Sequence, residues 1–178
     1  ASAYNFFKPA VPKTPKLDHQ WIAKAMGVKD VRYYLNYLHS DGAKLTATDG
    51  HRLHQCNVSD LAEGYYDNQL IAVECDGRYP DVDRVIPKNY TEKMSIELFK
   101  TILNSSEVTP IGKLGQFVRI DHKDSKLNIG ANLSYINDVL CGMSDHANVI
   151  YQPNSPCDKL LFVDETLDRL AVVMSARL

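Results

Sequence analysis

The sequence predicts an α+β protein, because a short helix followed by several antiparallel strands occurs twice along the chain. Apolar residues at helical spacing mark the helices, and short runs of β-branched and aromatic residues between turn dipeptides mark the strands. The chain has 178 residues, of which 44% are hydrophobic and 24% are charged. This size and composition allow a buried core for about one domain or one and a half.

The first half is expected to open with an extended arm. Residues 1–16 carry prolines at every third position from Pro9 to Pro15, a spacing that disfavours a helix. Asp18 can then cap a helix that runs to Met26 and ends at Gly27. Beyond this helix, strands are predicted over residues 31–39, 45–58 and 69–75, with a tight turn at 41–42 and a break at 49–50.

The second half repeats the same order of elements. Ile96, Phe99, Ile102 and Leu103 lie at near-helical spacing, which predicts a helix over residues 95–103. The other predicted elements are a hairpin of strands 117–120 and 126–129, a helix over 132–143, and closing strands over 149–152, 160–163 and 170–174.

Bulk composition argues against several classes of protein. The net charge of -2 lacks the basic excess that is usual in a dedicated nucleic-acid binder. No apolar run approaches the roughly 18 residues that a bilayer span needs, and no secretory leader is visible. The four cysteines are widely spaced, which is typical of free thiols in a reducing cytosol. We therefore expect a cytoplasmic protein.

The residues closest to a catalytic or metal site are Asp49, His51 and His54. They could ligate a metal, or His51 could act as a base that Asp49 orients. Their spacing fits no strong zinc pattern, and the sequence has no nucleophile elbow and no glycine-rich phosphate loop. We therefore expect no enzyme, no cofactor and no metal. The favoured interpretation is a backbone turn at Asp49 and Gly50, with His51 and Arg52 at a surface edge.

Three separated segments carry a resemblance to one family. Residues 46–53, 77–88 and 172–178, in this order, are similar to segments of the bacterial DNA polymerase III beta subunit, the sliding clamp. Residues 30–36 resemble the start of the middle domain of that clamp, and residues 131–140 resemble the last helix of its third domain. The similarity runs over residues 17–59 and 76–178. The joint between these blocks is shortened, and no counterpart of the first clamp domain is present.

The resemblance implies a DNA-clamp fold of repeated helix-plus-antiparallel-sheet units. It divides the chain into the proline-rich arm of residues 1–16 and two clamp-like parts. Residues 17–85 resemble the start of the middle domain, and residues 86–178 resemble a shortened third domain. In this family the similar segments line a groove that captures short peptides of polymerases and repair proteins.

The same resemblance implies which residues form the groove. Met174 suits a binding wall because its flexible thioether adapts to different ligands. Ser175 and Ala176 replace a Pro and a Met of the family's ending, so a shallower groove floor is expected. Asn132 could hold a peptide backbone, and Tyr135 could offer an aromatic face with a polar tip. The implied groove residues are Leu35, Thr48, Gly50, His51, Arg52, Leu53, Pro80, Arg84, Val85, Asn132, Tyr135, Pro156, Val172, Val173, Met174, Ser175, Ala176, Arg177 and Leu178.

The function implied by the resemblance is that of a sliding-clamp-like protein of DNA replication or repair, of phage, plasmid or bacterial origin. Its partners would be clamp-binding peptides of polymerases or clamp-loader proteins, with a glutamine followed by Leu and Phe. In one version the chain forms a homo-oligomeric ring that holds duplex DNA. In the other it forms no ring and competes with, or adapts, the partners of the host clamp. The lysines available to face DNA are Lys24, Lys29, Lys93 and Lys100.

Overall fold

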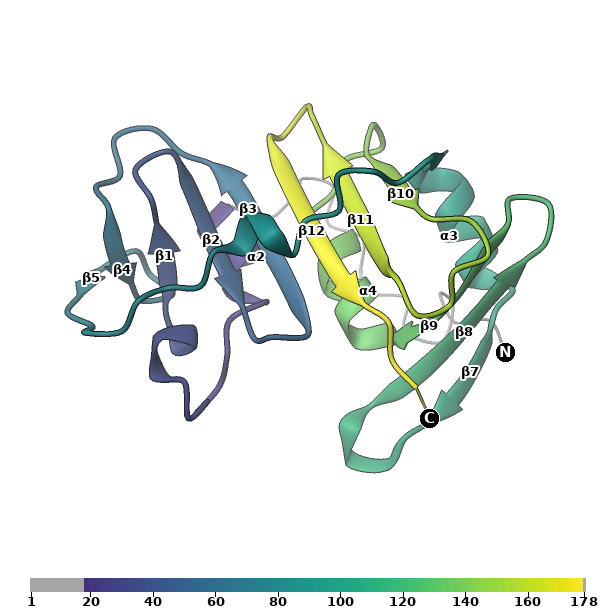
Figure 1. Cartoon of the computed structure of the whole chain (residues 1–178), viewed down its shortest axis with the longest axis horizontal. Helices are drawn as coiled ribbons and strands as arrows, with labels where there is room; N and C mark the ends of the chain where they lie inside the picture. Colours follow the sequence, from purple (N-terminus) through teal and green to yellow (C-terminus); the bar gives the residue numbers. More distant parts are fainter. Residues whose placement is uncertain (1–17, 178) are drawn as a thin grey trace.

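The computed structural model describes residues 18–177, in which strands form two antiparallel sheets (Figure 1). The larger sheet has nine strands in the order β5-β4-β1-β2-β3-β12-β11-β10-β6, and the smaller has the order β7-β8-β9. Helices and antiparallel sheets together confirm the predicted α+β class. The predicted arm of residues 1–16, and the groove residue Leu178, lie outside the described residues. The helices of residues 18–177 are all too short or too polar to span a bilayer.

The first half contributes a short helix and one flank of the large sheet. Asp41 fixes the predicted turn of the first hairpin, since its Oδ1 accepts hydrogen bonds from the backbone N–H groups of Ala43 and Lys44 at 2.9 and 2.7 Å. The elements are α2 (Asp18–Ala23), a 3-10 turn η1 (Tyr33–Asn36), β1 (Leu38–Ser40), β2 (Lys44–Thr48), β3 (Arg52–Asn57), β4 (Gly64–Tyr66) and β5 (Ala72–Val73).

Three predictions for the first half were wrong. The helix ends at Ala23 instead of Met26, because the chain tightens into turns in which Lys24 N–H bonds Trp21 O at 3.2 Å. Residues 31–37 form a bend and η1 rather than a strand. The Asn36 side-chain amide accepts a hydrogen bond from the N–H of Asp30 and donates one to the carbonyl of Asp30, which holds the chain in the bend. The predicted strand over 69–75 shrinks to β5, and β4 was not predicted.

The second half follows its prediction more closely. Ser95 Oγ accepts the N–H of Leu98 at 3.1 Å, and Asn132 Oδ1 accepts the N–H of Ser134 at 2.9 Å, so both helices begin at side-chain caps. Strands β6 and β7 were not predicted. The elements are β6 (Glu92–Ser95), α3 (Ile96–Asn104), β7 (Glu107–Pro110), η3 (Gly112–Leu114), β8 (Gln116–His122), β9 (Leu127–Asn132), α4 (Leu133–Leu140), β10 (Asn148–Tyr151), β11 (Lys159–Asp164) and β12 (Arg169–Met174).

The two halves meet in a strand pair. β3 and β12 pair antiparallel, with Leu53 opposite Val172. One core cluster continues through both halves and includes residues of α2, α3 and α4, such as Trp21, Phe99 and Ile136. Trp21 joins α2 to α4, because its buried Nε1–H donates to the carbonyl of Asp138 at 3.1 Å. The division of the chain into clamp-like parts at residue 85 remains a prediction.

The opposite face of the sheet carries a second, smaller core. Leu53, Leu161 and Val172 are buried there beneath the connector of residues 74–91, which contains η2 (Val82–Arg84). In Figure 1 this connector runs across the front of β3 and β12, while α4 lies behind them. Lys159 of β11 holds the connector by donating from Nζ to the carbonyl of Val85 at 2.9 Å. This outer face positions the candidate site.

Candidate functional site

A cavity of about 190 Å³ opens on the outer face of the large sheet, beside the junction of β3 and β12. The chain segments around it are far apart in the sequence: the η1 loop, the β2–β3 turn, the connector and the end of β12. Its lining is mostly apolar. The lining residues are Arg32, Tyr34, Leu35, Thr48, Gly50, Arg52, Leu53, Pro80, Val82, Val85, Val172 and Met174.

Strand alternation makes the floor of this cavity apolar. Leu53 and Val172 are direct cross-strand partners on the outer face, and both are almost fully buried. Met174 lies two residues after Val172 and therefore on the same face, where it is half-buried. Val173 points to the opposite face and packs in the main core. The floor thus presents apolar side chains to anything that enters from outside.

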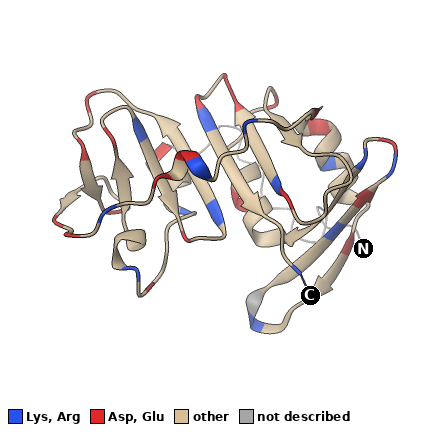
Figure 2. Ribbon diagram, in the orientation of Figure 1, with Lys and Arg blue, Asp and Glu red and all other residues tan. Residues whose placement is uncertain are grey.

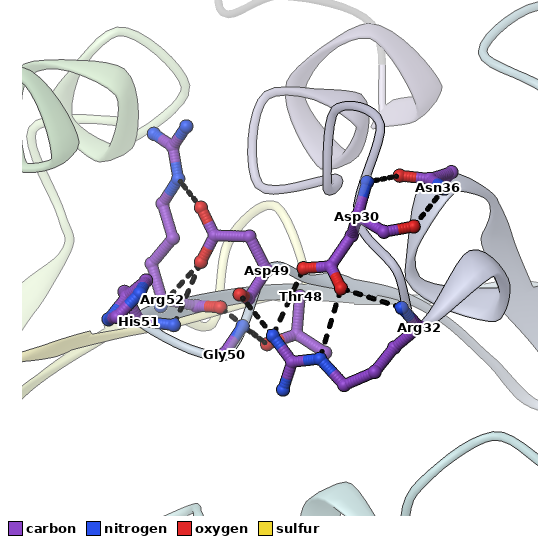
Figure 3. Close-up of polar contacts among 8 residues, drawn as sticks. All are labelled: Asp30, Arg32, Asn36, Thr48, Asp49, Gly50, His51 and Arg52. Carbon is purple, nitrogen blue, oxygen red and sulfur yellow. Dashed lines mark hydrogen bonds and ion pairs between the residues drawn. The ribbon is translucent and has the colours of Figure 1, made fainter.

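The β2–β3 turn forms a rigid polar edge of the cavity (Figure 3). Asp49 Oδ1 accepts the N–H groups of His51 and Arg52 at 2.8 and 3.1 Å, while Thr48 Oγ1 donates to Arg52 O at 2.7 Å and accepts Gly50 N–H at 3.1 Å. Gly50 has a φ of 92°, which favours glycine. Asp49 and Gly50 therefore serve as the predicted backbone turn. Within residues 18–177, no three His, Cys, Asp or Glu side chains group as a metal site.

The η1 loop supplies a neighbouring edge of the cavity through Arg32. The Arg32 guanidinium donates from Nε and Nη2 to the carboxylate of Asp30 at 3.1 and 3.0 Å, and from Nη2 to Asp49 O at 3.4 Å. Its hydrogen bonds hold the pKa of Asp30 below the ordinary value. Asn36 in turn fixes the backbone of Asp30 (Figure 3). These hydrogen bonds therefore fix the position of Arg32 at the cavity.

A second polar cluster lies on the helix side of the sheet, around Arg52. Its guanidinium lies over the Tyr135 ring at 4.1 Å and pairs with Asp49 and Asp138 at 3.1 and 2.6 Å. Burial raises the pKa of Tyr135. Asn132, which was predicted to hold a peptide backbone, uses its side-chain oxygen to cap α4. This cluster fixes the β2–β3 turn to α4 beside the cavity.

The end of β12 and the residues that follow it connect the two sheets. Met174 N–H donates to His51 O at 3.1 Å, and Ala176 N–H donates to Gly130 O of β9 at 2.8 Å. Arg177 then donates to the thiol sulfur of Cys157 at 2.7 Å. Figure 1 shows this segment leaving β12 toward β9. Ser175 and Ala176 are half-buried along this path, beyond the cavity lining.

The structure brings together part of the predicted groove. Arg32, Tyr34 and Val82 line the cavity and were not predicted, although Leu35 of the same segment as Arg32 and Tyr34 was. The predicted residues that line it are Leu35, Thr48, Gly50, Arg52, Leu53, Pro80, Val85, Val172 and Met174. The predicted residues that lie outside its lining are His51, Arg84, Asn132, Tyr135, Pro156, Val173, Ser175, Ala176 and Arg177.

The lysines predicted to face DNA are dispersed over the fold. Lys24 follows α2 and pairs with Asp138 at 3.6 Å. Lys29 lies in the exposed loop before η1, Lys93 is exposed on β6, and Lys100 is half-buried on α3. Figure 2 shows basic and acidic residues mixed along the visible ribbon rather than separated by sign.

Known proteins match this chain in structure but not in sequence. Neither a protein-family model nor a curated protein matches the chain by sequence. Its fold is similar to the DNA polymerase III subunit beta from Pseudomonas aeruginosa, with a TM-score of 0.64 and 20% identity over 96% of this chain and 69% of that one. The Bacillus subtilis DNA polymerase sliding clamp matches with a TM-score of 0.64 and 14% identity, over 90% of this chain and 61% of that one.

The Caulobacter crescentus beta sliding clamp gives a similar result, with a TM-score of 0.61 and 20% identity over 90% of this chain and 63% of that one. At these identities the likeness establishes the fold. The chain therefore has the sliding-clamp fold that its segments predicted. It matches only part of the length of these clamps.

Proposed function

We propose that this chain, with its bacterial sliding-clamp fold, acts in DNA replication or repair by binding short peptide segments of polymerase or clamp-loader proteins. The observation that carries the proposal is the apolar cavity on the outer face, with Leu53, Val172 and Met174 at its floor. Its volume of about 190 Å³ suits one or two apolar side chains better than a large cofactor.

The cavity is preorganised, and this favours peptide binding. Its turn, its loop and its connector are each fixed by hydrogen bonds in the free chain, so little ordering entropy is lost when a ligand enters. Each apolar side chain buried against the floor contributes roughly 1.5–3 kcal/mol. After the cost of association, two such anchors support a dissociation constant in the micromolar range.

The structural matches support ligand binding as the proposed activity. One of the Pseudomonas aeruginosa clamps is described as bound to griselimycin, and another as a sliding clamp with ligand. These clamps share the fold of this chain at 19% and 20% identity. We propose ligand binding for this chain as well, because it has an apolar cavity of its own.

Met174→Asp tests this assignment, because a carboxylate at the cavity floor would be desolvated by an apolar anchor. A fluorescent peptide with a glutamine followed by Leu and Phe should bind the wild type with micromolar affinity by anisotropy. Met174→Asp should weaken binding at least about tenfold, since one lost anchor is worth roughly 1.5–3 kcal/mol. The control Leu98→Asp, at an exposed apolar position on α3, should bind like the wild type. Equal binding by wild type and Met174→Asp would refute the site.

A second proposal concerns DNA, and one contact favours the version without a ring. Asp138 on α4 pairs with both Lys24 and Arg52, and Asp49 pairs with Arg52 as well, so two carboxylates offset these two cations. A chain that competes for clamp-binding peptides, or adapts them to another partner, needs no cations there. A ring around duplex DNA remains the alternative, with several copies closing around the duplex.

A further inference from the structure

We propose that Arg32 makes the cavity selective for peptides that place a carboxylate directly beside the apolar anchor. The inference rests on the proposed peptide binding and specifies the class of peptide that binds best. It comes from three features of Arg32: where its guanidinium lies, which of its N–H donors are used, and which other polar groups line the cavity.

The Arg32 guanidinium meets Gly50 end-on. A Cβ built on Gly50 would be 3.1, 3.3 and 3.7 Å from Nη2, Nη1 and Cζ of Arg32, so the two terminal nitrogens are nearer to that point than the central carbon is. Gly50 has no side chain to fill this space, and its φ of 92° is a backbone conformation that favours glycine. The guanidinium therefore lies at the edge of the cavity, against the β2–β3 turn.

One edge of the guanidinium is committed and the other is free. Nε and Nη2 bond Asp30, and Nη2 also bonds Asp49 O, whereas Nη1 makes no hydrogen bond with any residue of the described chain. Figure 3 shows this terminal nitrogen of Arg32 pointing away from Asp30 without a dashed line. Asn36 holds Asp30, so the free edge keeps its orientation. Arg32 is thus a preorganised donor with two N–H groups to offer.

Two other polar side chains of the cavity, Thr48 and Arg52, are already engaged. The Thr48 hydroxyl both donates and accepts within the β2–β3 turn, and the Arg52 guanidinium is paired with Asp49 and Asp138. Arg52 is the other cation in the lining, but its side chain is 13% exposed against 48% for Arg32. A ligand anchored on Leu53 and Val172 therefore meets the Nη1 edge of Arg32 more readily. A carboxylate there gains a charge-assisted hydrogen bond that a neutral amide does not.

The expected preference is moderate. Asp30 compensates part of the Arg32 charge, and the Arg32 side chain is 48% exposed, so water screens the contact. We expect a peptide that ends in a free carboxylate directly after its last apolar anchor to bind about three to ten times tighter than the same peptide with a terminal carboxamide.

Anisotropy measurements with these two peptides test the inference. The full chain should prefer the acid peptide, and the preference should shrink as salt is raised, because the contact is ionic. Arg32→Gln should bind the acid and the amide equally. Arg84→Gln is the matched control, because Arg84 is a nearby cation outside the cavity lining, and it should keep the preference.

Two results would overturn the inference while peptide binding stands: equal binding of acid and amide by the wild type, or an unchanged preference in Arg32→Gln. If Arg32→Gln does not fold, the acid-to-amide ratio of the wild type and its decline with salt decide the question. Failure of both peptides to bind the wild type would instead refute the proposed function, and this inference with it.

Discussion

At the scale of single residues, burial strongly changes the acidity of His54. It is fully buried on β3 and stacks on Trp21, with ring centroids 4.2 Å apart. Its Nδ1 lies 2.8 Å from the carbonyl oxygen of Trp21. Because a carbonyl only accepts, Nδ1 carries the proton of the neutral ring, and Nε2 is left buried without a hydrogen-bond partner among the described residues. Burial lowers the pKa of His54 to about 3.

His54 therefore predicts a loss of stability in mild acid. Between its ordinary pKa near 6.5 and the folded value of about 3, the unfolded chain binds the proton and the folded chain does not. The free energy of unfolding should be unaffected by His54 above pH 6.5 and should fall by roughly 2 kcal/mol from pH 6.5 to 4.5. Urea unfolding should show this loss in the wild type and much less of it in His54→Phe. Parallel losses in both proteins would contradict the assignment.

At the scale of elements, local signals explain which predictions succeeded. The caps Ser95 and Asn132 and the turn at Asp41 fix their elements by contacts within a few residues, so sequence reasoning found them. The bend over residues 31–37 depends on a side-chain network around Asp30, which overrides the strand preference of its aromatic residues. Without that bend, the sequence did not indicate that Arg32 reaches Gly50.

The groove was predictable to the extent that it follows strand alternation and the family resemblance. Leu53, Val172 and Met174 share one face of neighbouring strands, and they were predicted correctly as neighbours. Val173 and Tyr135 were placed in the groove by their position in matching segments, but they lie on the helix side of the sheet. Which partner each side chain meets there depends on packing between distant segments.

The segment after β12 supplies a prediction at this scale. Met174 N–H and Ala176 N–H tie it to the β2–β3 turn and to β9. Deleting residues 174–178 should abolish peptide binding, because Met174 leaves the cavity floor. It should also lower the free energy of unfolding by roughly 1–3 kcal/mol through lost burial, a large share of a domain's stability. A truncated chain that melts at the wild-type temperature and still binds peptide would show that this segment is not engaged.

At the scale of the whole molecule, charge and fold point in different directions. The proposed ring around DNA would need at least a mildly positive inner wall, yet the net charge is -2 and basic and acidic residues are mixed along the ribbon (Figure 2). Lys24 is paired with Asp138, which removes one of the dispersed lysines as a phosphate contact. Peptide binding on the outer face requires neither a ring nor a basic surface.

We therefore expect weak affinity for linear duplex DNA that is lost at moderate salt. Each phosphate contact adds about one unit to the slope of log affinity against log salt, and few lysines are placed to make one. A titration of labelled duplex over a range of salt measures that slope, and light scattering on the same sample gives the oligomeric state. A nanomolar, salt-resistant complex would contradict this expectation. A closed oligomer would favour the ring over the competitor.

The central claim is that peptides bind in the outer-face cavity, and photo-crosslinking tests it most directly. A clamp-binding peptide whose phenylalanine is replaced by benzoylphenylalanine would be irradiated with the full chain, and the adducts mapped by mass spectrometry. The account predicts adducts on cavity residues such as Val85, Val172 and Met174, suppressed by excess unlabelled peptide. Adducts on α3 or α4, or adducts that excess peptide does not suppress, would contradict it.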